Sequence, residues 1–97
     1  MDERIQTLNP DANKKGVNIS RAKYEQMRAA VLAALEEQEE PQTFYGLLDR
    51  VKKLLGDSFE GSISWYYTSV KLDLEARGEI ERIPGTSPQQ IRHRKRD

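Results

Sequence analysis

The spacing of apolar residues changes within one short stretch, LEARGEIERI at residues 74–83, and this change decides the fold. Up to Leu74 the apolar residues recur every three or four positions, as they do along one face of a helix. From Glu79 to Ile83 polar and apolar residues alternate, as they do in a half-buried strand. Gly78 stands between the two patterns, where a glycine commonly ends a helix. The stretch therefore predicts a helix that is followed at once by a strand.

A second strand is expected shortly after the first. Residues 84–88 read PGTSP, a composition that is typical of a turn. A short strand at residues 90–93 would then return beside the first and form a β-hairpin, and another short strand near residues 42–43 would complete a small sheet. The residues of the hairpin that we expect to face the core are Ile80, Ile83 and Ile91.

Three helices are predicted before the hairpin. Each opens at a Ser or Thr whose hydroxyl can accept a hydrogen bond from the first turn. Each ends close to a proline or a glycine, which interrupt helices. The helices are expected at residues 20–38, 43–55 and 62–77, with Ser62 and Ser64 as alternative openings of the third.

The junction between the third helix and the hairpin resembles the same junction in many bacterial winged helix-turn-helix regulators. In those proteins a leucine four residues before a glycine anchors the helix, and an isoleucine two residues after the glycine begins the wing strand. Leu74, Gly78 and Ile80 occupy these positions here. The resemblance implies an α+β, mainly α fold, a winged helix in which a three-helix bundle is followed by a β-hairpin wing, over residues 20–94.

The chain as a whole is also similar to a family of small, uncharacterised bacterial proteins. The similarity runs from the sequence NPD at residues 9–11 to GSISWYY at residues 61–67. This second resemblance implies no function. The organisation that we expect is an N-terminal arm packing on the domain (1–19), the winged-helix domain (20–94) and a basic tail (95–97).

Composition limits the kinds of function. A chain of 97 residues has room for one compact domain, and 33% of its residues are charged, above the roughly 25% of an average soluble domain. Sixteen basic residues balance sixteen acidic ones, whereas dedicated nucleic-acid-binding proteins usually carry a basic excess. The charges are unevenly distributed, however, with glutamates gathered at residues 36–40 and basic residues at 92–96. A neutral total is therefore compatible with one basic face.

No catalytic or metal-binding set is evident in the sequence. Cysteine is absent, and the single histidine, His93, lies in the basic C-terminal stretch, so neither a nucleophile–histidine pair nor a zinc site can be assembled. We therefore expect a protein that is not an enzyme and uses no cofactor or metal. Residues 1–20 hold no apolar run, and no stretch is long enough to span a bilayer, so we expect a cytoplasmic protein without membrane contact.

The winged-helix resemblance implies a DNA-binding protein, such as a small transcriptional regulator, that reads double-stranded DNA with the third helix and the wing. The third helix carries few cations for such a protein, with Lys71 and Arg77 beside several acidic residues. Polar side chains on one flank of the helix would read base edges, and arginines of the hairpin would attract the DNA. The proposed nucleic-acid-binding residues are Ser62, Ser64, Thr68, Lys71, Arg82, Arg92 and Arg94.

Trp65 and Leu72 favour an alternative function. Both fall on the side of the third helix opposite its core stripe, where an isolated domain is normally polar. In one interpretation the N-terminal arm covers them with its apolar residues Ile5, Leu8 and Val17. In the other they form a protein–protein interface, either for a homodimer or for a different partner, with Trp65 as its anchor. The sequence leaves both interpretations open.

Overall fold

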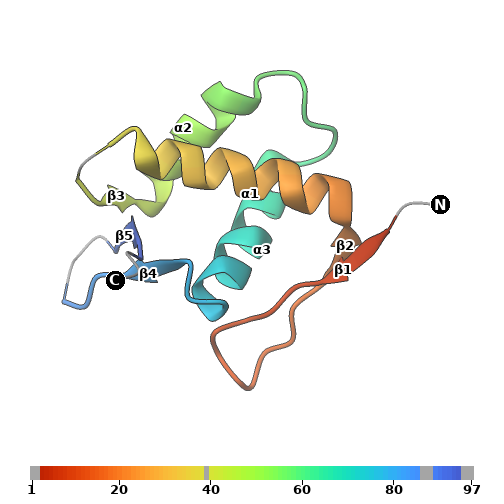
Figure 1. Ribbon diagram of the computed structural model, residues 1–97, viewed down its shortest axis with the longest axis horizontal. Coiled ribbons are helices and arrows are strands. Elements are labelled where there is room, and N and C mark those ends of the chain that lie inside the picture. Colours follow the sequence, from red (N-terminus) through yellow and green to blue (C-terminus); the bar gives the residue numbers. More distant parts are fainter. Residues whose placement is uncertain (1–2, 39, 86–88, 95–97) are drawn as a thin grey trace.

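The computed structural model describes residues 3–38, 40–85 and 89–94. Three helices and two small antiparallel sheets make up an α+β fold, in which α1 crosses the molecule between α2 and the lower part of α3 (Figure 1). Along the chain the elements are β1 (Arg4–Gln6), β2 (Asn18–Ser20), α1 (Arg21–Glu36), β3 (Gln42–Thr43), α2 (Phe44–Leu55), α3 (Ile63–Ala76), β4 (Ile80–Arg82) and β5 (Gln90–His93).

The helices begin at the hydroxyl residues that the sequence indicates. Ser20, Thr43 and Ser62 each accept a hydrogen bond from the backbone N–H three residues further on. The third helix therefore opens at Ser62 and not at Ser64. Gly56 ends α2 with a positive φ of 55°, a conformation that glycine adopts more readily than any other residue.

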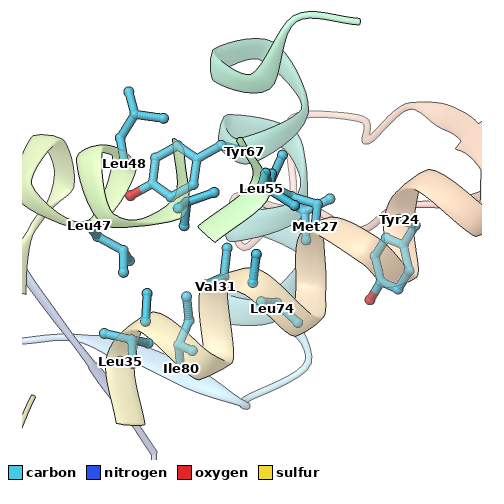
Figure 2. Close-up of a cluster of buried hydrophobic side chains, with 14 of the residues drawn as sticks. Tyr24, Met27, Val31, Leu35, Leu47, Leu48, Leu55, Tyr67, Leu74 and Ile80 are labelled. Carbon is cyan, nitrogen blue, oxygen red and sulfur yellow. The ribbon is translucent and has the colours of Figure 1, made fainter. Parts of the chain in front are cut away.

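One hydrophobic core lies where the three helices meet, and Figure 2 shows their side chains pointing toward one another there. Every helix contributes fully buried residues, among them Met27, Val31, Leu47, Val51, Tyr67, Val70 and Leu74. The hydroxyl of Tyr67 has a partner in this apolar setting, because it donates a hydrogen bond of 2.8 Å to the carbonyl oxygen of Phe44. This bond joins the start of α2 to the middle of α3.

A three-stranded sheet in the order β3-β5-β4 closes one end of the core. In the β4–β5 hairpin Glu81 lies opposite Arg92, and Arg82 lies opposite Ile91. The hairpin and the short strand at Gln42–Thr43 are thus confirmed.

The isoleucines of the hairpin differ in burial. Ile80 and Ile91 are in the core as expected, whereas Ile83 follows the end of β4 and is half-buried. Part of the predicted turn, residues 86–88, lies outside the described residues, as does the basic tail at 95–97.

The residues before α1 form a hairpin that the sequence pattern does not predict. β1 pairs with β2, and β2 continues directly into α1. Beyond β1, Thr7 is buried: its hydroxyl accepts a hydrogen bond from the N–H of Val17, and its own N–H donates to the carbonyl oxygen of Val17, both at 2.8 Å. A Cβ atom on Gly16 would lie 1.9 Å from the carbonyl oxygen of Thr7, so this close approach requires glycine.

Candidate functional site

The outer face of α3, defined here as Ser64, Trp65, Thr68 and Leu72, is the surface that both sequence hypotheses single out. Helical spacing brings these four residues together on the side away from the core. Ser64, Trp65 and Thr68 are exposed, and Leu72 is half-buried. The hydroxyl of Thr68 donates a hydrogen bond of 2.9 Å to the carbonyl oxygen of Ser64, and its own oxygen remains available as an acceptor. This face therefore offers hydroxyl groups next to an exposed indole.

Lys71 does not lie on this exposed face, so the prediction that it joins the polar flank is wrong. The residue is 3% exposed, and its Nζ atom lies 2.6 Å from Oε1 of Glu75 and 5.5 Å from the centre of the Phe44 ring. Burial lowers the pKa of the Lys71 ammonium, and the neighbouring Glu75 carboxylate partly offsets that effect. The start of α2 covers the lysine, a long-range contact that helix periodicity does not reveal. Lys71 cannot contact an external ligand in this arrangement.

Glu75 links the buried lysine to the hairpin. Its side chain is 5% exposed, and its second oxygen, Oε2, accepts a hydrogen bond of 2.9 Å from Nε of Arg82. Arg82 reaches α3 because it stands opposite the buried Ile91 in the hairpin and so leans toward the core side of the sheet. One carboxylate is therefore shared by two cations, and the side chain of Arg82, at 44% exposure, is the most exposed of the three.

The other two arginines of the predicted DNA surface lie elsewhere on the hairpin. Arg92 is on the opposite face of the sheet from Arg82, where its Nε atom is 2.8 Å from Oε1 of Glu81. A hollow there also includes Glu36 and Glu40. Arg94 is exposed, and its guanidinium lies close to Gly78, just beyond the end of α3.

The structure thus brings some of the predicted site residues together and separates others. Ser64 and Thr68 share the outer face of α3, and Arg82 is fixed to the C-terminal half of the same helix through Glu75. Ser62 is exposed at the N-terminal end, where its hydroxyl caps the helix by accepting from Trp65 N–H at 3.2 Å. Arg92 faces another part of the surface.

Trp65 is not covered by the N-terminal arm, so that interpretation is wrong for this residue. It is 48% exposed, and its ring packs edge-on against Tyr66, with ring centres 4.9 Å apart. Tyr66 in turn packs against the buried Phe59, and Nζ of Lys23 lies 5.2 Å from the centre of the Tyr66 ring. The indole ring is thus supported by two aromatic side chains, Tyr66 and Phe59, the second of which belongs to the core. Leu72 differs from it, because a hollow beside Leu72 is also lined by the arm residues Asn9 and Pro10.

Asp73 explains where the arm lies, although no pattern in the sequence points to this residue. The residue is fully buried in α3 and accepts hydrogen bonds from the backbone N–H of Leu8 and from Nε of Arg77, each at 2.8 Å, and from the hydroxyl of Tyr24. Burial and the bond to Asp73 both raise the pKa of Tyr24 well above its usual value. Asp73 lies eight residues after Trp65, about 12 Å along a helix. The arm is consequently attached too far along α3 to cover the indole.

A comparison with known families then places the chain. The model of a family of unknown function, DUF6958, matches residues 4–91. The chain belongs to the DUF6958 family. The DUF6958 match begins in β1 and ends within β5, so it includes the arm from Arg4 onward, the three helices and the hairpin as far as Ile91. No match was found among curated proteins or among solved structures.

Two further observations concern metal binding and membrane-spanning helices in this DUF6958 chain. Across residues 3–38, 40–85 and 89–94, no group of three or more His, Asp or Glu side chains is arranged to hold a metal ion. Within the same residues, no helix combines the length and the apolar character needed to cross a membrane.

Proposed function

We propose that this chain is a winged helix-turn-helix protein that binds double-stranded DNA. In this proposal α2 and α3 form the helix-turn-helix, α3 enters the major groove, and the β4–β5 hairpin is the wing that contacts the flanking backbone. The order of elements from α1 to β5 and the strand order β3-β5-β4 support it. The protein would act in the cytoplasm as a small transcriptional regulator, by binding and without catalysis.

The observation that carries the proposal is the combination of short hydroxyl side chains on the outer face of α3 with a cation beside them. Ser64 and Thr68 are exposed and small, so they allow the helix backbone to approach base edges, where the Ser64 hydroxyl can donate or accept and the Thr68 hydroxyl can accept. The side chain of Glu75 is only 5% exposed, whereas that of Arg82 is 44% exposed. A DNA strand next to this helix would therefore meet the positive member of the cluster and not the negative one.

The charges of the hairpin set the strength of binding that we expect. Arg82 and Arg94 are positioned near α3. Arg82 shares the single carboxylate of Glu75 with Lys71, so that cluster keeps a net positive charge, whereas Arg92 is paired one to one with Glu81. Two phosphate contacts give a slope of about −1.8 for log K against log salt, or roughly a twelvefold loss of affinity for a fourfold rise in salt. The interaction should be modest in affinity and visibly sensitive to salt.

Fluorescence anisotropy of a labelled random-sequence duplex tests the proposal. The duplex is titrated with the protein at about 50 mM and at about 200 mM salt. The proposal expects saturable binding at the lower salt that weakens at least tenfold at the higher salt. Absence of binding at both salt concentrations, with protein in the high micromolar range, would contradict it.

The exposure of Trp65 supports a second candidate function, a module that binds a protein through Trp65 and Leu72. A half-exposed tryptophan that packs against a neighbouring tyrosine ring is a suitable anchor for an interface. The partner would be a second copy of this chain or another protein. Sedimentation of the wild type and of Trp65→Ala over a range of concentrations tests the second-copy form. This form expects an association that the substitution removes, and a monomer at all concentrations argues against it.

A further inference from the structure

The turn of the N-terminal arm, residues 9–15, is held in a defined shape before any ligand binds. The amide of Asp11 donates to Oδ1 of Asn9, and the amide of Asn13 donates to Oδ1 of Asp11, both at 2.9 Å. The amide of Lys14 donates to the carbonyl oxygen of Asp11 at 3.0 Å. At the base of the turn, Thr7 exchanges two hydrogen bonds with Val17. The backbone of the turn is thus fixed by its own hydrogen bonds.

This turn is also fixed in position against α3. The buried carboxylate of Asp73 accepts the N–H of Leu8, the residue that precedes the turn. In Figure 1 the loop between β1 and β2 extends below the C-terminal end of α3. A shared hollow shows that the two elements are neighbours, since it is lined by Pro10, Asp11 and Lys14 from the turn and by Leu72, Glu75 and Arg82 from α3 and β4.

The turn carries two lysines that have no salt-bridge partner in the described part of the protein, and one acidic residue, Asp11, so its net charge is positive. Lys14 and Lys15 are exposed, and neither forms a salt bridge with any residue of 3–38, 40–85 or 89–94. Most arginines nearby differ in this respect: Arg28, Arg77 and Arg82 each have a carboxylate partner. Among the described residues, positive charge beside α3 that has no carboxylate partner therefore comes from the arm turn and from Arg94, and not from α3 itself.

We propose that Lys14 and Lys15 bind the phosphodiester backbone of duplex DNA, on the strand that borders the groove occupied by α3. This inference rests on the DNA-binding function proposed above and adds the arm to the DNA surface. Lysine ammonium groups on a flexible stem neutralise phosphates without reading sequence. The arm would then supply affinity and orientation, while the hydroxyls of α3 face the bases.

The test is the salt dependence of binding to a labelled random-sequence duplex, compared among three proteins. These are the wild type, the double variant Lys14→Ala/Lys15→Ala, and the control Lys52→Ala/Lys53→Ala. The control removes the same charge from two exposed lysines in the last turn of α2, at the opposite end of the molecule from the arm turn (Figure 1). Thermal unfolding of each protein verifies that the fold is retained, which we expect because all four side chains are exposed.

Each phosphate contact contributes about 0.9 to the slope of log K against log salt. With two contacts from the hairpin and two from the arm, we expect a slope of about −3.6 for the wild type and about −1.8 for the arm variant. The slope of the control variant should differ from the wild-type slope by no more than about 0.5, since Lys52 and Lys53 would not contact phosphate.

The outcomes separate this inference from the function on which it rests. If the wild type binds and the slope of the arm variant is unchanged, or if the control loses as much slope as the arm variant, the arm contact is wrong while DNA binding stands. If the wild type does not bind the duplex at either salt concentration, both proposals are overturned. Loss of slope in the arm variant alone supports the inference.

Discussion

Replacing Asp73 with alanine is the perturbation that most directly probes how the fold is assembled. The carboxylate is fully buried and receives three hydrogen bonds, from α1 through Tyr24, from the arm through Leu8 and from α3 through Arg77. Alanine removes all three and leaves the Tyr24 hydroxyl and the Leu8 amide without their acceptor. The substitution should therefore weaken the contacts between three separate parts of the chain at once.

The expected magnitude follows from the partners. Removing one member of a buried ion pair costs about 3–5 kcal/mol, and a buried donor that loses its acceptor costs about 1–3 kcal/mol. The lower end of the range for an ion pair applies here, because the Arg77 side chain is 37% exposed and water can solvate it after the change. We expect a loss of about 3 kcal/mol, which lowers the Tm of a domain of this size by roughly 12–24 °C.

Thermal unfolding followed by circular dichroism measures this change, with Asp49→Ala as the control. Asp49 is an exposed aspartate of α2, so its substitution should leave the Tm nearly unchanged. Hydrogen exchange adds a local measurement: the amide of Leu8 should lose its protection in Asp73→Ala. A fall in Tm below about 4 °C, corresponding to less than about 1 kcal/mol, would refute the role assigned to Asp73.

Three further predictions concern single residues. Trp65→Ala should destabilise the protein by about 1.5 kcal/mol, because the side chain is 48% exposed and a buried tryptophan would lose roughly 3–5 kcal/mol. Urea denaturation measures the loss, and a value in the larger range would contradict the exposure of Trp65. Gly16→Ala should displace the arm, because the new Cβ would overlap the carbonyl oxygen of Thr7, and an unchanged exchange rate at the Thr7 amide would argue otherwise. Burial raises the pKa of both Tyr24 and Tyr67, so the unfolded chain releases these protons near pH 10 while the folded protein keeps them. The free energy of unfolding should consequently fall as the pH rises above about 10, and Tyr67→Phe should reduce that fall in urea titrations; an equal pH dependence in the two proteins would count against it.

The sequence predicted those features that depend on neighbouring residues. Hydroxyl caps at Ser20, Thr43 and Ser62, the end of α3 before Gly78 and the alternation in β4 are all local, since each is determined within a few positions. The placement of Trp65 away from the core was also readable from helical spacing alone. Local pattern was sufficient for the order of the elements.

The features that the sequence did not predict depend on contacts between distant residues. Lys71 looks like an exposed residue on a helical wheel, yet the start of α2 covers it, and Glu75 offsets the cost of its burial. The arm hairpin has short strands with few β-branched or aromatic residues, and its position depends on Asp73, 65 residues away from Leu8. A pattern within one element contains no information about such a partner.

The central claim is that the outer face of α3 contacts duplex DNA, and amide chemical shifts measured on adding DNA test it most directly. Uniformly ¹⁵N-labelled protein is titrated with a short random-sequence duplex at low salt. The claim predicts that the signals of Ser64, Thr68 and the Trp65 indole move first and furthest, while that of Asp49 on the outside of α2 does not change. Shifts that leave α3 unaffected, or that are confined to α2, would contradict it.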